Sequence, residues 1–312
     1  MQHLVNHSVY SQSGKQPSLH PGDGIELLTG YFETDVSQFR DAVSVHLPYV
    51  VDWYSVWDGR LKIPDDMADD SVLFFSYGRD SESIIEAVRK GIECARPFDP
   101  AYGVIHAGSA NIDELFSETY SDSDHEVLSA FAEIVNEAVS SFPGGEPPFR
   151  LMFENQWWPG LRMLDGKDYG ILCDKMEFEN WGLCLDTGHL LVTTQESRDE
   201  MQAIDLLVDI FNGYPAEMID DIGVIHLHLN TSAGYIRNYK VPEGIGKMSI
   251  NDRLNIGYGF VGGMDQHRPF TVKDVRRITD ILKPDYVTHE MGAPEPEARQ
   301  ADYLSQRSLF ML

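Results

Sequence analysis

Short apolar runs alternate with longer helical patterns along almost the whole chain. The runs are rich in β-branched and other apolar residues and are bounded by Gly, Pro, Asp or Asn, which is typical of buried strands. The eight predicted strands cover residues 3–10, 24–28, 43–47, 102–107, 149–154, 182–186, 223–229 and 286–290. Amphipathic helical spacing predicts helices over 81–95, 125–142, 197–214 and 271–282. Eight strands separated by mostly helical segments predict an α/β protein, a (β/α)8 TIM barrel in one domain that covers residues 1–312.

Two connections depart from this pattern. Residues 11–23, between the first two strands, are polar and broken by Gly and Pro, so the first βα unit should be irregular. The segment 230–264, after the seventh strand, contains seven glycines and predicts a long loop. One interpretation is a mobile loop that covers the site and contacts an anionic substrate; the other is a solvated insertion that binds nothing. The candidate substrate-binding residues of this loop are Arg237, Lys240, Lys247 and Arg253.

Charge and cysteine content narrow the functional classes. With 24 Lys and Arg against 50 Asp and Glu, the net charge is −26, which argues against a dedicated nucleic-acid surface, so duplex DNA is not an expected partner. Three cysteines without CxxC spacing argue against a disulfide framework and a thiolate zinc site. The segment MQHLVNHSVY lacks the pattern of a signal peptide, and no apolar run approaches the roughly 18 residues of a membrane helix. We therefore expect a cytoplasmic protein without a membrane partner.

Ionisable side chains stand at the C-terminal ends of six predicted strands. They are His46, His106, Glu154, Asp186, His228 and Glu290, and His189 follows three residues after Asp186. In a β/α barrel these strand ends meet on one face, where active sites are built. Buried carboxylates and imidazoles need a balancing charge, and a mixed set of such ligands suits zinc, manganese or iron. The pattern predicts a divalent metal centre.

Spacing within the strands separates stronger from weaker candidates. His226 and His228 are two residues apart and share one face of a strand, the face turned into the barrel. His228 is nearer the strand end and is the better ligand candidate, whereas His226 is expected to support the ligands or the core. His289 neighbours Glu290 and should face the opposite way. Trp157 follows Glu154 closely and could wall a substrate pocket, with simple packing as the alternative.

Seven short motifs occur in a fixed order along the chain: HLPY (46–49), VIHAG (104–108), FEN (153–155), LDTGH (185–189), HLN (228–230), DQH (265–267) and HE (289–290). As an ordered set they resemble the xylose isomerase-like TIM barrel superfamily. That superfamily includes sugar and sugar-phosphate isomerases and epimerases, and the endonuclease IV type of AP endonuclease (family 2). The resemblance extends from about the second strand to the eighth, and LDTGH is its most specific motif.

The resemblance implies two overlapping sets of metal ligands. The single-metal isomerase and epimerase pattern maps to Glu154, Asp186, His228 and Glu290, in which the two glutamates are the acid/base pair beside the metal. The endonuclease IV pattern implies a site with three zinc ions and adds His46, His106, His189, Asp265 and His267. All nine positions are filled, which favours a multinuclear site, although several of the added histidines also occur in members that are not nucleases.

Three functional hypotheses follow. The favoured one is a divalent-metal-dependent isomerase or epimerase of a small, anionic, sugar-like or phosphorylated substrate, in which the metal polarises substrate oxygens while Glu154 and Glu290 move a proton. The alternative is a phosphodiester hydrolase of the endonuclease IV type, in which clustered zinc ions generate hydroxide. The third is a non-catalytic binding barrel. We expect one to three zinc or manganese ions per chain, with one ion favouring the isomerase and two or three favouring the hydrolase.

Overall fold

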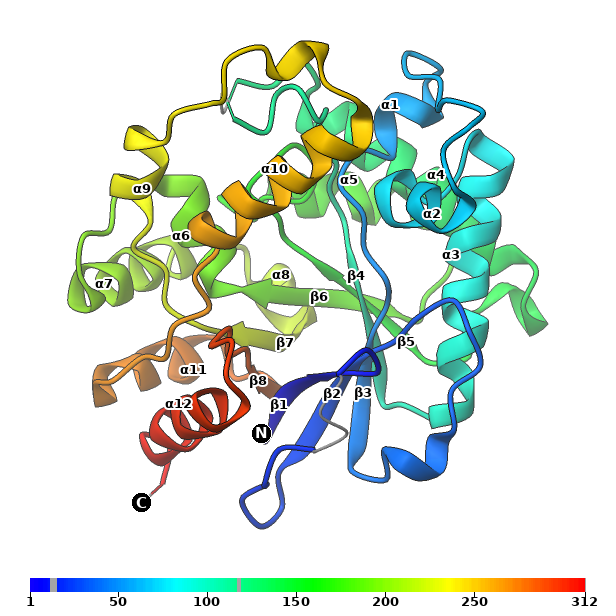
Figure 1. Cartoon of the computed structure of the whole chain (residues 1–312). Coiled ribbons are helices and arrows are strands. Elements are labelled where there is room, and N and C mark those ends of the chain that lie inside the picture. The colour runs from blue at the N-terminus through cyan, green and yellow to red at the C-terminus, as the bar shows by residue number, and fades with distance from the viewer. Residues whose placement is uncertain (12–15, 117–118, 312) are drawn as a thin grey trace.

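The computed structural model describes residues 1–11, 16–116 and 119–311. Its eight strands form a closed parallel barrel in which each strand pairs with the next and β8 pairs with β1 (Figure 1). The strands are β1 Gln2–Ser8, β2 Gly24–Leu28, β3 Ala42–His46, β4 Tyr102–His106, β5 Arg150–Glu154, β6 Trp181–Asp186, β7 Ile222–Leu227 and β8 Tyr286–His289. The predicted (β/α)8 barrel and its eight strands are confirmed.

The helices lie around the outside of the strands (Figure 1). They are α1 Tyr54–Trp57, α2 Asp69–Ser76, α3 Ser81–Ala95, α4 Asp124–Ser140, α5 Lys167–Lys175, α6 Thr187–Thr194, α7 Glu200–Phe211, α8 Ala216–Asp221, α9 Ala233–Asn238, α10 Ile250–Met264, α11 Arg276–Leu282 and α12 Pro296–Ser308. Short 3₁₀ turns are η1 Val36–Gln38, η2 Arg96–Phe98, η3 Pro143–Gly145, η4 Ile245–Lys247 and η5 Lys273–Val275. The four helices expected from amphipathic spacing correspond to α3, α4, α7 and η5 with α11.

Alternation along the strands divides the barrel interior into two layers. The lower layer is a small apolar cluster that contains Leu4, Tyr102, Val104, Met152, Cys184 and Val224. One inward position further along β4, β5 and β7, the residues become ionisable: His106 follows Val104, Glu154 follows Met152, and His226 follows Val224. The intervening residues, such as Ile225 and Leu227, belong to the large cluster between strands and helices. The two-residue period of a strand therefore places a polar layer on an apolar floor.

The connection after β7 is long, as expected, but much of it is helical. It contains α9, η4 and α10, so the long connection expected over 230–264 is present and helices make up much of it. Ser249 caps α10 by accepting a hydrogen bond from the backbone N–H of Asp252 at 3.1 Å. Two of the glycines permit close packing, because a Cβ at Gly257 would lie 3.1 Å from Leu115, and one at Gly263 would lie 2.4 Å from the ring of Tyr235.

The β1–β2 connection agrees with the sequence-based prediction where it is described. Residues 9–11 and 16–23 contain no helix, and residues 12–15 lie outside the described residues. All three cysteines are free. Within the described ranges, no helix has both the length and the apolar character required to cross a membrane.

The loop after β5, which follows Glu154, is held against the end of β4. Gly160 and Gly108 form an isolated antiparallel bridge, and the Leu161 N–H donates to the carbonyl oxygen of Ala107 at 2.8 Å. Gly160 has a φ of +130°, and a Cβ there would lie 2.3 Å from that same carbonyl oxygen. Glycine is thus required twice, by the backbone angle and by the close approach of the chain.

We predict that Gly160→Ala lowers the free energy of unfolding by about 3 kcal/mol, because backbone strain and overpacking add. Gly59→Ala is the matched control, since Gly59 also has a positive φ of +79° but has no atom within 4 Å of its added Cβ. The control should cost about 1 kcal/mol, from strain alone. Chemical denaturation of both variants measures the difference, and equal losses would contradict the steric argument.

Candidate metal centre

The nine residues of the predicted ligand set converge at the C-terminal end of the barrel. Seven of them line a cavity of about 360 Å³: His46, His106, Glu154, His189, Asp265, His267 and Glu290. The other two, Asp186 and His228, are fully buried and contact these lining residues. The structure therefore brings together every residue that the sequence motifs nominated as a ligand.

Glu154 lies at the centre of one part of the cluster. Its Oε2 atom is 3.1 Å from His46 Nε2 and 3.2 Å from His106 Nε2. Its Oε1 atom is 3.3 Å from His189 Nδ1 and 3.5 Å from His226 Nδ1. Both oxygens of one carboxylate therefore face imidazole nitrogens, although the side chain is 1% exposed.

Asp186 caps helix α6 and also contacts a candidate ligand, His228. These two contacts explain the aspartate of the LDTGH motif. It is the N-cap of α6, where its Oδ1 atom accepts the backbone N–H of His189 at 2.6 Å. Its Oδ2 atom is 2.9 Å from His228 Nε2. Gly188 lies against the same imidazole, because a Cβ there would be 1.9 Å from His228 Cε1. The glycine of the motif thus leaves space for a candidate ligand.

A third group of side chains closes the cluster beside the end of α10. Oδ2 of Asp265 is 3.5 Å from His189 Nε2 and 3.4 Å from His267 Nδ1. His267 Nε2 in turn is 3.2 Å from Oε2 of Glu290. The rings of His228 and His267 are stacked with centroids 4.2 Å apart, so this group continues directly into the Asp186 group.

The sequence interpretation missed Glu26, on β2, which contacts the expected supporting residue His226. Oε2 of Glu26 accepts hydrogen bonds from hydroxyl groups of Ser44, Tyr102 and Thr288. Its Oε1 atom is 2.8 Å from His226 Nε2. The signal in the sequence was a single glutamate within the apolar run GIELL, at a position that the strand period turns inward.

The imidazole of His226 links Glu26 to the predicted ligands. Its Nδ1 atom is 3.5 Å from Oε1 of Glu154 and 3.4 Å from Oε1 of Glu290. Burial lowers the pKa of His226, but nearby Cys184 and the surrounding carboxylates raise it well above its ordinary value. His226 therefore holds two candidate ligands in position from below.

The charges of the cluster outweigh burial at His189 and Glu154, whereas burial still lowers the pKa of His106. Burial lowers the pKa of His189, yet the carboxylates of Asp186 and Asp265 raise it to about 10. Burial raises the pKa of Glu154, but the imidazoles of His106 and His226 hold it well below its usual range. Carboxylates and imidazoles thus stabilise one another's charged forms, as expected where opposite charges share a buried site.

The donors fit a divalent cation. Among the described residues, four sets of three donor atoms lie within 4.8 Å of one another: His46, Glu154 and His226; Asp186, His189 and His228; His228, Asp265 and His267; and Glu26, His226 and Glu290. His228 Nδ1 and Asp265 Oδ1 are buried without a hydrogen-bond partner in the described part of the chain, and they lie 3.9 Å apart. Unpartnered buried polar atoms are costly, and a cation between such atoms would satisfy them.

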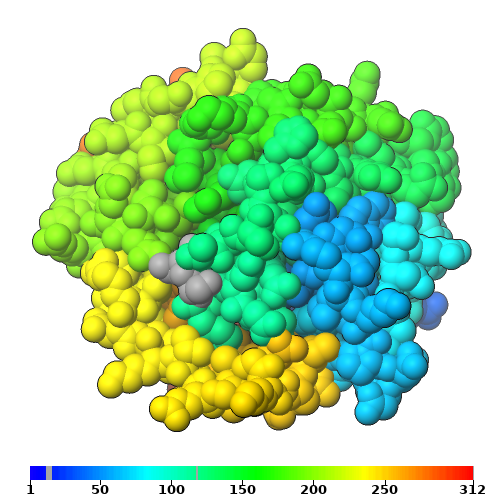
Figure 2. Space-filling view, turned by 90° about the horizontal axis from the view of Figure 1, so that it is seen from above, coloured from blue at the N-terminus to red at the C-terminus, as the bar shows by residue number. Residues whose placement is uncertain are grey.

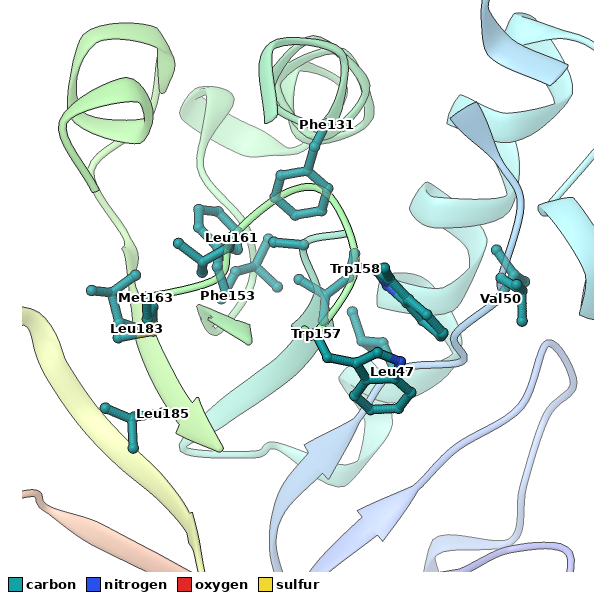
Figure 3. Close-up of a cluster of buried hydrophobic side chains, with 14 of the residues drawn as sticks. Leu47, Val50, Phe131, Phe153, Trp157, Trp158, Leu161, Met163, Leu183 and Leu185 are labelled. Carbon is teal, nitrogen blue, oxygen red and sulfur yellow. The ribbon is translucent and has the colours of Figure 1, made fainter. Parts of the chain in front are cut away.

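Aromatic side chains form much of the cavity wall. Trp157 and Trp158 point from the loop after β5 toward the segment that bears Leu47 and Val50 (Figure 3), and both line the cavity. The ring of Trp157 is 4.7 Å from that of His189, which is the place where the sequence predicted a pocket wall. Tyr49 lines the cavity too, and its ring stacks on that of His106 at 4.4 Å.

Helix α10 lies over the cavity and reaches the opposite rim. The segment that contains it (yellow and orange in Figure 2) lies against the loops that precede α2 and α4. The Tyr258 hydroxyl donates to the carbonyl oxygen of Phe74 at 3.1 Å, and Arg253 forms an ion pair with Asp113. Leu254, Gly257 and Tyr258 line the cavity, so α10 is part of its wall.

The four predicted substrate-binding cations are not in the cavity lining. Arg237, Lys240 and Lys247 are exposed to solvent, and Arg253 is paired with Asp113. Because the segment folds into helices, these side chains do not lie over the cavity, as they could in a mobile loop. The arginine that does line the cavity is Arg299, on α12, which no motif in the sequence indicated.

Comparisons with solved structures support the fold. A D-tagatose 3-epimerase-like protein superposes with a TM-score of 0.54 at 15% identity, covering 99% of this chain and 97% of that one. Endonuclease IV from Thermus thermophilus has a TM-score of 0.52 at 14% identity, covering 99% and 98% of the two chains. The probable 3-DHS dehydratase of Bacillus anthracis has a TM-score of 0.51 at 14% identity, covering 97% of each. No protein-family model and no curated sequence matches the chain.

We predict that Gly188→Ala displaces His228 and weakens zinc binding by at least about tenfold, as expected when the support of a ligand is disturbed. The matched control is Gly170→Ala on α5, where an added Cβ meets no atom within 4 Å. The control should bind zinc normally and gain about 1 kcal/mol of stability, since alanine is the better helix former. Competition with a chromophoric chelator measures zinc affinity, and wild-type affinity in Gly188→Ala would contradict the prediction.

Proposed function

We propose that the chain is a divalent-metal-dependent hydrolase of a phosphoester bond in a small, anionic substrate. Its fold, which is that of xylose isomerase-like TIM barrels such as epimerases and endonuclease IV, supports assignment of the chain as an enzyme of this type. The observation that carries this proposal is the convergence of all nine predicted ligands on one cavity. A single-metal isomerase would use only Glu154, Asp186, His228 and Glu290. It would leave the imidazoles and the carboxylate on either side of this set without a role.

We assign the nine ligands to three ions, in groups that overlap the four donor sets given above but do not coincide with them. Glu154 would hold one ion with His46 and His106, whose Nε2 atoms are both near its Oε2. A second ion would be held by Asp186, His228 and Glu290, whose carboxylates lie 2.9 and 3.8 Å from His228 Nε2. A third would be held by His189, Asp265 and His267, in which both imidazoles lie within 3.5 Å of Asp265 Oδ2. Zinc or manganese suits such mixed oxygen and nitrogen donors.

Charge balance supports more than one ion. The site contains five carboxylates, those of Glu26, Glu154, Asp186, Asp265 and Glu290. With neutral imidazoles, a charge of −5 from these groups becomes −3 with one divalent ion and +1 with three. A site at −3 would repel an anion, whereas a site near +1 would attract one. Each added ion therefore makes the site more favourable to an anionic substrate, which supports a multinuclear centre.

The ions and the protein would have separate roles in the reaction. Divalent ions held by these residues would activate water as a nucleophile at neutral pH and would offset the charge of phosphoryl oxygens. Trp157, Tyr49 and the buried face of α10 would exclude bulk water from the cavity and strengthen electrostatic interactions within it. Glu26, through His226, would keep Glu154 and Glu290 oriented toward the centre.

The shape of the site supports a small substrate over duplex DNA. A cavity of about 360 Å³ suits a small metabolite, and α10 forms one wall. The net charge of −26 also opposes the approach of a polyanion. We therefore place the chain with small-molecule enzymes, even though its proposed ligand set resembles that of endonuclease IV.

A single-metal isomerase or epimerase is the second candidate. The observation that favours it is the position of the two glutamates, since Oε1 of Glu154 and Oε1 of Glu290 both approach Nδ1 of His226, at 3.5 and 3.4 Å. Two carboxylates this close could act on the same bound sugar as an acid/base pair.

Metal stoichiometry and reaction type together separate the candidates. We predict that the purified protein retains two or three divalent ions after exhaustive dialysis, measured by elemental analysis. It should hydrolyse a small phosphoester such as p-nitrophenyl phosphate or bis(p-nitrophenyl) phosphate. One ion, with deuterium exchange into a ketose seen by NMR, would favour the isomerase. Metal-free protein whose melting temperature does not respond to zinc would contradict both. Tight binding and cleavage of an abasic-site duplex would contradict the choice of a small substrate.

We further predict that His106→Asn removes about one metal equivalent and lowers phosphoester hydrolysis by at least about 100-fold, because His106 belongs only to the extended ligand set. His125→Asn, at an exposed position on α4, is the matched control and should change neither quantity. Thermal denaturation checks that both variants are folded. Full activity of His106→Asn would show that the extended set is not needed for the reaction.

A further inference from the structure

We infer that Arg299, with Asn6 and His7 beside it, forms a second recognition point in the cavity, which binds an anionic group of the substrate at a distance from the metal centre. This inference rests on the proposed function and specifies its substrate class. The substrate would carry a phosphoester at the metal centre and a second anionic group, a carboxylate or a phosphate, at Arg299.

Arg299 lies on α12 and is half-buried in the cavity lining. Its Nε atom donates to the carbonyl oxygen of Ala293 at 3.1 Å, which holds the guanidinium group beside the segment that follows Glu290. Within the described residues, the two terminal nitrogens of this guanidinium have no hydrogen-bond partner and no ion pair. They are therefore available to bind both oxygens of a carboxylate or phosphate.

The absence of an ion pair is informative in a chain of this composition. There are 50 acidic residues to 24 basic ones, and other arginines such as Arg60, Arg89, Arg277 and Arg307 contact carboxylates. Among the described residues, Arg299 is left without such a partner at a place where a bound anion could replace it. A half-buried cation in a cavity lining that is not paired with a carboxylate indicates ligand binding more directly than an exposed lysine does.

The neighbours of Arg299 are suited to the same ligand. His7 and Asn6, at the end of β1, line the cavity with it, and all three also line a second hollow that opens beside α12. Asn6 is fixed by two hydrogen bonds to the backbone of Met291, and so joins β1 to the segment after Glu290. Glu297 is the acidic side chain in the second hollow; it is exposed to solvent, so water screens its charge.

Arg299 lies apart from the proposed metal centre, but close enough for one ligand to contact both. Ala293, whose carbonyl fixes the guanidinium, is three residues after Glu290, so these residues are at most about 11 Å apart along the chain. A molecule with a few carbon atoms between two charged groups spans such a distance. A ligand that binds both the proposed metal centre and Arg299 must therefore have its two anionic groups at a matching distance. This requirement is a basis for selecting one substrate among phosphorylated metabolites.

The test uses zinc-loaded protein and non-hydrolysable probes. Phosphonoacetate, 4-phosphonobutyrate and 6-phosphonohexanoate carry a phosphonate and a carboxylate at increasing separation. Ethyl-, butyl- and hexylphosphonate lack the carboxylate. Isothermal titration calorimetry should show one member of the first series binding at least about tenfold more tightly than its alkyl counterpart. Arg299→Gln should abolish that advantage while leaving zinc content and alkylphosphonate affinity unchanged.

Arg237→Gln is the matched control, because Arg237 is an exposed arginine outside the cavity lining. It should keep the full advantage of the carboxylate. Equal binding of the carboxylate probes by wild type and Arg299→Gln, or no binding of them by wild type, would overturn the second recognition point. Failure of every alkylphosphonate to bind fully zinc-loaded protein would instead count against the proposed phosphoester chemistry, whatever the result at Arg299.

Discussion

The structure depends on the burial of many ionisable groups in one small volume at the end of the barrel. Five carboxylates and six imidazoles meet there, and several of them, including Asp186, His226 and His228, are inaccessible to solvent. Charges in such a place are costly unless they are paired and hydrogen-bonded. Each carboxylate accordingly faces imidazoles, and Glu26 also accepts three hydroxyl hydrogen bonds. The surrounding architecture provides those partners, from the cap of α6 to the glycine that leaves room for His228.

The apolar and the ionisable layers of the barrel support each other. An apolar floor that contains Val104, Met152 and Val224 excludes water from below, and the next inward residues form the polar layer. The connections that follow the strands place Trp157, Trp158 and α10 in the wall of the cavity above this layer. Because most of these ionisable side chains are buried, solvent screens their charges weakly and they interact strongly. The same enclosure limits the size of any molecule that can reach it.

Local pattern was enough to predict the strands and most of the candidate site. The two-residue period of strands such as β4 and β7 determines both the fold and which side chains turn inward, so His106 and His228 could be predicted with the barrel. Features that depend on tertiary contacts could not be predicted from the sequence. The glycines of α10 resemble those of a loop until Leu115 and Tyr235 are known to pack against them. Arg299 belongs to no motif and reaches the cavity because α12 lies beside the end of β1.

The location of positive charge distinguishes this site from a surface that attracts polyanions. The exposed cations of the 230–264 segment lie outside the cavity, where a net charge of −26 and solvent screening weaken their effect on a distant ligand. Arg299 is half-buried in the cavity lining, where screening is weaker than at the exposed surface. Proposed metal ions at one end and a single arginine at the other would favour a short molecule with two negative groups. A long strand of nucleic acid would meet the acidic exterior first, and repulsion from those surface charges would oppose its approach to the centre.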